Sequence, residues 1–180
     1  DSRRLGVAVR KHPQARQFSD YREMLSQLGS KIDVITVSTA DHTHAPATMM
    51  AMKQGIHVYV QKPLTHTVWE ARQLAVMARK KNICTQMGNQ GTASDGIREG
   101  AELLQAGGIG SVKEIHAWTN RPVWPQSPQI IARPPEKMEP PSYLDWNSFI
   151  GPAPMRPYHS CYTPFKWRGW LNWTNSPIMS

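Results

Sequence analysis

Short apolar runs alternate with longer amphipathic stretches along the first part of the chain. The runs have the length of strands buried in a parallel sheet, and the stretches between them have helical periodicity. We predict strands at residues 33–38, 57–60, 83–87 and 112–119, and helices at 1–11, 46–54, 67–81 and 94–106. Because strands and helices alternate, the chain is expected to form βαβ units, and the predicted fold class is α/β with a parallel sheet.

Local signals support several of the predicted helix ends. Pro46 suits the first turn of a helix, and Gly55 suits the position just after its last turn. Thr67 and Glu70 have the spacing of a capping box, in which each residue satisfies a backbone N–H of the other.

The character of the chain changes after Asn120. Of the 15 prolines, 11 lie between Pro122 and Pro164, so no long helix can cross this stretch. The stretch and its continuation also contain Trp124, Trp146 and Trp167, which is too aromatic for a flexible linker. We therefore expect an ordered excursion that packs on the domain, and a domain boundary near residue 110.

The composition is that of a globular protein, with 39% hydrophobic and 19% charged residues. The net charge of +8 raises the possibility of nucleic-acid binding. However, the longest basic run is only residues 79–81, and the other cations are scattered among acids, which favours a solvated surface. Cys84 and Cys161 lie too far apart for a metal motif, and Cys84 is expected in the core. No stretch has the length of a membrane span.

Polar residues follow the first three predicted strands directly. In an open parallel sheet, ligands bind where the strands end at their carboxyl edge. The polar stretches are residues 38–44 (STADHTH), 61–63 (QKP) and 88–91 (GNQG). Their recurrence at one sheet edge predicts a binding site there.

These stretches, with their surroundings, carry a specific resemblance. Residues 55–64 (GIHVYVQKPL) resemble the Gfo/Idh/MocA family of oxidoreductases. Residues 87–91 (MGNQG), 117–122 (AWTNRP), 157–159 (PYH) and 167–170 (WRGW) further resemble a branch of it that is common in environmental bacteria. The resemblance covers nearly the whole chain.

The resemblance implies an NAD(P)-dependent oxidoreductase that transfers a hydride between a nicotinamide cofactor, NAD or NADP, and a sugar or polyol-like substrate. Residues 1–110 would be the C-terminal part of a dinucleotide-binding Rossmann domain. Residues 111–180 would begin an α/β substrate and oligomerisation domain with an open sheet. The partners implied are a small sugar-like molecule and further copies of the chain, with no nucleic acid, membrane or metal.

The family's Glu-Lys-Pro motif corresponds to residues 61–63. By this resemblance Lys62 is the catalytic residue, placed between the nicotinamide ribose and the substrate. A lysine there can hydrogen-bond the reacting hydroxyl and help to move its proton. The family's glutamate is Gln61 here, which keeps hydrogen bonding but lacks the charge that could tune Lys62.

The other cofactor contacts are also assigned by resemblance. The loop after the first strand matches a Thr-Pro-Asn-x-x-His motif that borders the cofactor, with Ala40 in place of the proline. A Trp-Arg pair would approach the cofactor from the second domain. The expected cofactor-binding residues are Ser38, Thr39, Asp41, His44, Gln61, Lys62, Asn89, Gln90, Trp167 and Arg168. A capping or helix-packing role for His44 is the alternative at that position.

The resemblance also implies that the chain lacks both ends of the enzyme. A glycine-rich phosphate loop would precede Asp1, and the general base would follow residue 180, so the chain alone is expected to be inactive. The compartment would be the cytoplasm, or an exported location if an upstream signal peptide exists.

Other functions remain as alternatives. His42 and His44 have the spacing of a metallohydrolase pair, but the further ligands of those families are missing. A branch of the same family cleaves glycosides without net redox change, but it tends to carry a tyrosine near Thr92, which this chain lacks. A noncatalytic protein is the third alternative.

Overall fold

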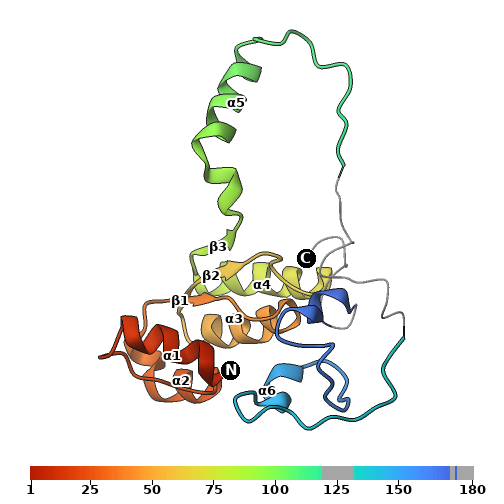
Figure 1. Ribbon diagram of the computed structural model, residues 1–180. Helices are drawn as coiled ribbons and strands as arrows, with labels where there is room; N and C mark the ends of the chain where they lie inside the picture. The colour runs from red at the N-terminus through yellow and green to blue at the C-terminus, as the bar shows by residue number, and fades with distance from the viewer. Residues whose placement is uncertain (119–131, 171–172, 174–180) are drawn as a thin grey trace.

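The fold is built on a three-stranded parallel sheet with the order β1-β2-β3. The computed structural model describes residues 1–118, 132–170 and 173 (Figure 1). The strands are β1 (Val34–Val37), β2 (His57–Gln61) and β3 (Thr85–Gly88). The predicted α/β class with a parallel sheet is therefore confirmed.

Helices connect and cover these strands. They are α1 (Ser2–Lys11), α2 (Tyr21–Leu28), α3 (His44–Lys53), α4 (Val68–Lys81), α5 (Asp95–Gln105) and the short α6 (Trp146–Ile150). Four 3₁₀ turns occupy Gly29–Lys31, Asp41–Thr43, Gln90–Ala93 and Lys166–Gly169. α3 crosses from β1 to β2 and packs on α2, α4 and β2.

The first core lies between the sheet and these helices. Its centre is formed by Ala51 and Met52 of α3 and by Val58 and Val60 of β2, all of them at most 3% exposed. The two β2 residues alternate with half-buried Tyr59, as expected for a strand with one face against helices.

Most sequence-predicted elements of residues 1–110 are present. The capping box at the start of α4 forms as predicted: Thr67 Oγ1 accepts from the Glu70 N–H at 3.2 Å, and a Glu70 carboxylate oxygen accepts from the Thr67 N–H at 2.8 Å. α3 begins two residues earlier than predicted, at His44. Helix α2 was not predicted, although Tyr21, Met24, Leu25 and Leu28 follow helical spacing after the N-cap Asp20.

Two predictions were wrong. Residues 112–118 form no strand, because none of the described strands lies beside them to accept their hydrogen bonds, and Val112, Ile115 and Trp118 are exposed. Cys84 is exposed rather than buried, since Ile83 takes the inward position beside it. Thr119, Trp124 and residues 120–122 lie outside the described residues.

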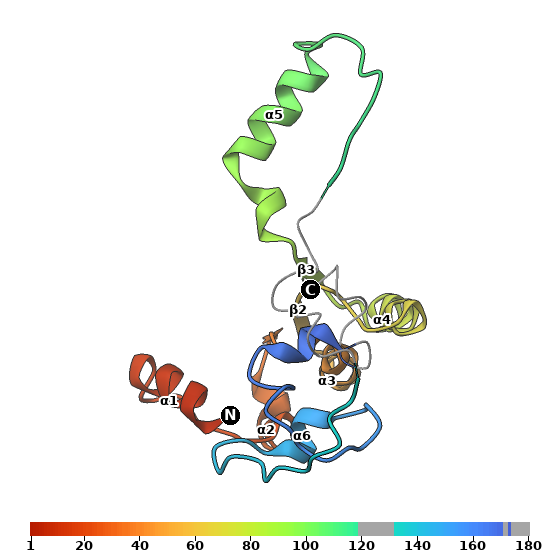
Figure 2. The same cartoon turned by 45° about the vertical axis from the view of Figure 1, so that its right-hand side comes forward.

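α5 stands apart from the sheet in both views of the molecule (Figures 1 and 2). None of its residues is buried, and Ile97, Leu103 and Leu104 are at least half exposed. No helix in the described part of the chain is long and apolar enough to cross a bilayer.

A second, aromatic core forms from the proline-rich part of the chain, shown in blue in Figure 2. Trp146 of α6 is stacked on Phe149 and Tyr162 and meets the edges of further rings. We call this set the aromatic cluster; its buried members are Trp146, Ile150, Tyr158, Cys161, Tyr162, Trp167 and Trp173. The predicted ordered excursion is therefore confirmed for residues 144–170.

His42 joins the aromatic cluster to the sheet. It lies in the 3₁₀ turn between β1 and α3, is 2% exposed, and its Nε2 lies 3.0 Å from the carbonyl oxygen of Phe149 and 3.1 Å from that of Ile150. The ring also lies 6.3 Å from that of Trp173. Burial lowers the pKa of His42 from 6.5 to about 4, although the backbone contacts oppose this shift. The imidazole is therefore neutral over the physiological range, with Nε2 as the donor.

The buried neutral state of His42 predicts an acid-sensitive fold. The folded pKa lies below the unfolded value, so the unfolded chain binds more protons between pH 6.5 and about 4, and stability falls as the pH falls through this window. At about 1.4 kcal/mol per pKa unit, the free energy of unfolding should drop by about 3 kcal/mol. Urea unfolding of wild type and His42→Gln at both ends of the window measures this.

The matched control is His12→Gln, since His12 is exposed on the loop after α1. The control should keep the full pH dependence of the wild type, whereas His42→Gln should lose most of it. An equal pH dependence in all three proteins would show that His42 does not carry the effect.

Candidate functional site

The three strands end at the same level of the sheet. In the parallel register Val37 pairs with Val60, Val60 with Met87, and Gln61 with Gly88. The loops that start at residues 38, 62 and 89 therefore leave the sheet side by side, as the sequence analysis expected for ligand binding.

His44 holds two of these loops together. It is 0% exposed; its Nδ1 lies 2.7 Å from the carbonyl oxygen of Pro63 and its Nε2 lies 3.0 Å from that of Thr39. Carbonyl oxygens only accept, so a neutral ring donates to one of them at a time and a protonated ring to both. The protein itself occupies both ring nitrogens, which makes His44 a positioning residue for the loops after β1 and β2.

A side-chain pair joins the second loop to the third. Gln90 Nε2 donates to Gln61 Oε1 at 2.9 Å and lies 3.3 Å from the Tyr59 hydroxyl. A Cβ at Gly88 would stand 2.4 Å from Gln61 Oε1, so glycine leaves the space that this contact needs. The structure therefore brings Gln61 and Gln90 together across the ends of β2 and β3.

Several of the expected site residues present free surface at this edge. The side chains of Ser38, Thr39, Lys62 and Asn89 are exposed. Thr43 Oγ1 donates to Thr39 Oγ1 or to the Ala40 carbonyl oxygen, each at 2.7 Å, and so fixes the turn after β1. Hydroxyl, amide and ammonium groups of this kind suit the phosphate, ribose and amide groups of a dinucleotide.

Asp41 does not share this exposure. It lies in the 3₁₀ turn between β1 and α3 and is 5% exposed. Asp41 is therefore buried in this turn, unlike Ser38 and Thr39 of the same loop.

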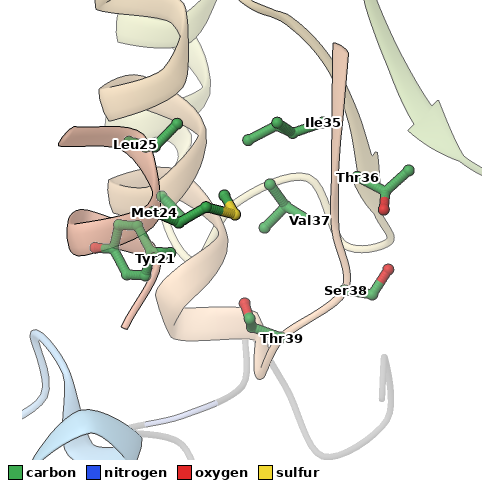
Figure 3. Close-up of a pocket in the computed structure, with 9 residues that line it drawn as sticks. Tyr21, Met24, Leu25, Ile35, Thr36, Val37, Ser38 and Thr39 are labelled. Carbon is green, nitrogen blue, oxygen red and sulfur yellow. The ribbon is translucent and has the colours of Figure 1, made fainter. Parts of the chain in front are cut away.

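A small pocket lies behind the carboxyl end of β1 (Figure 3). Ile35 and Val37 point into it, towards α2, while Thr36 and Ser38 point to the opposite side of the strand. Tyr21, Met24 and Leu25 of α2 form the other wall, and Thr39 lies at the lower end. Sequence reasoning missed the α2 side of this pocket, and the helical spacing of those three residues was the signal that could have found it.

Trp167 and Arg168 lie in the aromatic cluster rather than among the strand-end loops. Trp167 is 4% exposed, and the Arg168 guanidinium lies 3.8 Å from the centre of the Phe165 ring and 4.0 Å from that of Trp167. Their link to the sheet edge is indirect, since Ala40 packs against the aromatic cluster.

The two histidines of the metallohydrolase alternative face different carbonyl groups. His42 contacts the α6 backbone, and His44 contacts Thr39 and Pro63. Among the described residues, no three His, Cys, Asp or Glu side chains gather in a way that could hold a metal ion. The geometry therefore gives this alternative no support.

Comparison with known proteins agrees with this geometry. Residues 2–89 match the family described as "Oxidoreductase family, NAD-binding Rossmann fold". The chain is 32% identical over 98 residues to inositol 2-dehydrogenase 3 of Saccharopolyspora erythraea, covering 53% of this chain and 29% of that protein. It is 33% identical over 88 residues to a glycosyl hydrolase family 109 protein of a Shewanella strain, covering 46% of this chain and 19% of that protein.

Among solved structures, an inositol dehydrogenase homologue of Azotobacter vinelandii, complexed with NADH and myo-inositol, superposes with a TM-score of 0.51. It is 26% identical and covers 53% of this chain and 26% of that chain. The chain thus spans less than a third of the length of these relatives. Residues 2–89, which contain the parallel sheet and its three convergent strand ends, therefore match the GFO_IDH_MocA family of oxidoreductases.

Proposed function

We propose that the chain is part of an NAD(P)-dependent dehydrogenase that acts on a sugar or polyol-like substrate. The observation that carries this proposal is the convergence of three polar strand-end loops, tied together by His44 and by the Gln61–Gln90 pair. Residues 1–110 contribute to cofactor binding, and residues 111–180 begin the substrate domain. The inositol dehydrogenases among the relatives support a polyol substrate.

The exposed groups at the sheet edge fit a dinucleotide. Ser38 and Thr39 offer hydroxyl groups beside the first strand, and Asn89 offers an amide beside the third. The bound nicotinamide supplies the hydride acceptor or donor. NAD is the simpler choice, because the family and the solved homologue are described with NAD and NADH.

Lys62 is the proposed catalytic residue. Its side chain is exposed at the end of β2, between the loops of the other two strands. The neutral amine of a lysine there can accept the proton that a substrate hydroxyl loses as it is oxidised, and the ammonium form can return a proton to the carbonyl oxygen in the reduction. Gln61, fixed by Gln90, holds the neighbouring backbone in place.

Redox-neutral glycoside hydrolysis is the second candidate, because relatives of the glycosyl hydrolase family 109 type match 70 to 88 residues of the chain. It would use the same cofactor edge. Release of a chromophore from a glycoside without net NADH formation would favour hydrolysis, whereas NADH formation with a free polyol favours the dehydrogenase.

The first test is Lys62→Met in the dehydrogenase that contains this segment. We expect kcat to fall by about a hundredfold or more, since general acid–base groups contribute about 10²–10⁴. NADH affinity should stay within about tenfold, because methionine keeps most of the apolar part of the side chain and removes only the ammonium group. Steady-state kinetics and NADH fluorescence titration measure the two effects.

Lys53→Met is the matched control, since Lys53 is an exposed lysine at the far end of α3. It should leave both kcat and NADH affinity unchanged. Wild-type turnover in Lys62→Met would remove Lys62 from the mechanism.

The second test is Gln61→Glu. A carboxylate at this position still accepts the hydrogen bond from Gln90, so the loops should stay joined and activity should persist. The added negative charge favours the protonated form of the adjacent Lys62, so the pH profile of kcat should move to higher pH. An unchanged profile would mean that position 61 does not sense the reacting protons.

A further inference from the structure

Arg156 is a buried cation in the aromatic cluster. It is 7% exposed, and its Nε and Nη1 atoms are buried without a hydrogen-bond partner. Its backbone is firmly held, because Trp146 Nε1 donates to the Arg156 carbonyl oxygen at 2.8 Å. Buried guanidinium groups in proteins are normally paired with an anion, since leaving such a charge uncompensated is unfavourable.

The chain offers no carboxylate side chain for this purpose. Within the described residues, none of the ion pairs formed at 4.0 Å or less involves Arg156. The ranges 119–131, 171–172 and 174–180 contain no aspartate or glutamate at all. A side-chain counter-charge for Arg156 therefore cannot come from an undescribed part of this chain.

Aromatic rings surround the guanidinium instead. Its Cζ lies 4.7 Å from the ring centre of Trp173 and 5.9 Å from that of Tyr162. Ring faces attract a cation, but they do not accept the in-plane hydrogen bonds that Nε and Nη1 can donate. A side-chain hydrogen bond also joins Arg156 to Tyr162, but Nε and Nη1 remain without an acceptor.

A second donor without a partner lies beside the first. Trp173 is 0% exposed, and its indole Nε1, which can only donate, has no hydrogen-bond partner. The ring of His42 lies near that of Trp173, with a centroid distance of 6.3 Å. The buried charge of Arg156 and the unpartnered N–H groups of Arg156 and Trp173 would all be stabilised by a negatively charged hydrogen-bond acceptor.

We propose that Arg156 and Trp173 form a binding site for the oxyanion of a small ligand, a carboxylate or a phosphate. The guanidinium supplies the charge and the indole a neutral donor, while the surrounding rings exclude water and strengthen the interaction. The site adjoins the carboxyl end of β1 through His42. It does not depend on hydride transfer, so it can be tested without turnover.

The test measures thermal unfolding of the 180-residue chain in acetate, inorganic phosphate, acetamide and chloride at matched ionic strength. Acetate or phosphate should raise the unfolding midpoint in a saturable way, because a ligand that binds only the folded state stabilises it. Acetamide has the shape of acetate without its charge and should have no effect, as should chloride. The larger response, to acetate or to phosphate, identifies the oxyanion.

Arg156→Met should weaken the oxyanion response at least about tenfold, while Arg156→Lys should retain part of it. Arg133→Met is the matched control, since Arg133 is an exposed arginine whose charge also acts on Tyr162, and it should respond like wild type. The ligand-free Arg156→Met protein should unfold no more easily than wild type, because it loses an uncompensated charge.

A wild-type midpoint that is the same in acetate, phosphate and chloride would overturn the proposal. This comparison needs no variant, so it decides even if Arg156→Met fails to fold. An undiminished response in Arg156→Met would overturn it too, because the oxyanion would then bind elsewhere.

Discussion

The buried imidazole of His44 is the contact on which the proposed site depends. It joins the Thr39 and Pro63 carbonyl oxygens, and so holds the loops after β1 and β2 at one spacing. The parallel register brings those loops to the same edge, but it does not fix their conformations beyond the last strand pair. Because the ring is 0% exposed, water cannot compete for its two partners. Gln61 and Gln90 join the loops after β2 and β3 through a hydrogen bond between exposed side chains, which is weaker than the buried contacts of His44.

His42 and His44, separated by one residue, have different tasks. His44 organises the sheet edge from within, whereas His42 attaches the aromatic cluster to that edge through the α6 backbone. The aromatic cluster is thus held by His42, which lies just before Thr43, the N-cap of α3. Trp173 and His42 would separate a ligand group held by Arg156 from the proposed cofactor edge.

Local patterns in the sequence were enough to predict the elements that local interactions stabilise. The Thr67–Glu70 capping box is one example, since all its partners lie within three residues. The alternation at residues 112–119 was misleading, because a strand also needs a neighbour, and neighbours are not encoded locally. The part played by His44 could not be fixed from the sequence, since its Pro63 partner lies on a different loop. Arg156 carried no sequence signal at all, because its burial and its unpartnered donors arise only from the packing of the aromatic cluster.

We propose that the loops after β1, β2 and β3 together form a dinucleotide-binding edge. Titration of the ¹⁵N-labelled chain with NAD⁺, followed by amide chemical shifts, tests it most directly and detects even weak binding. We expect saturable shifts at residues 38–44, 61–63 and 88–91, with α5 unaffected as an internal reference. Shifts confined to other surfaces, or none in these three loops at saturating NAD⁺, would contradict it.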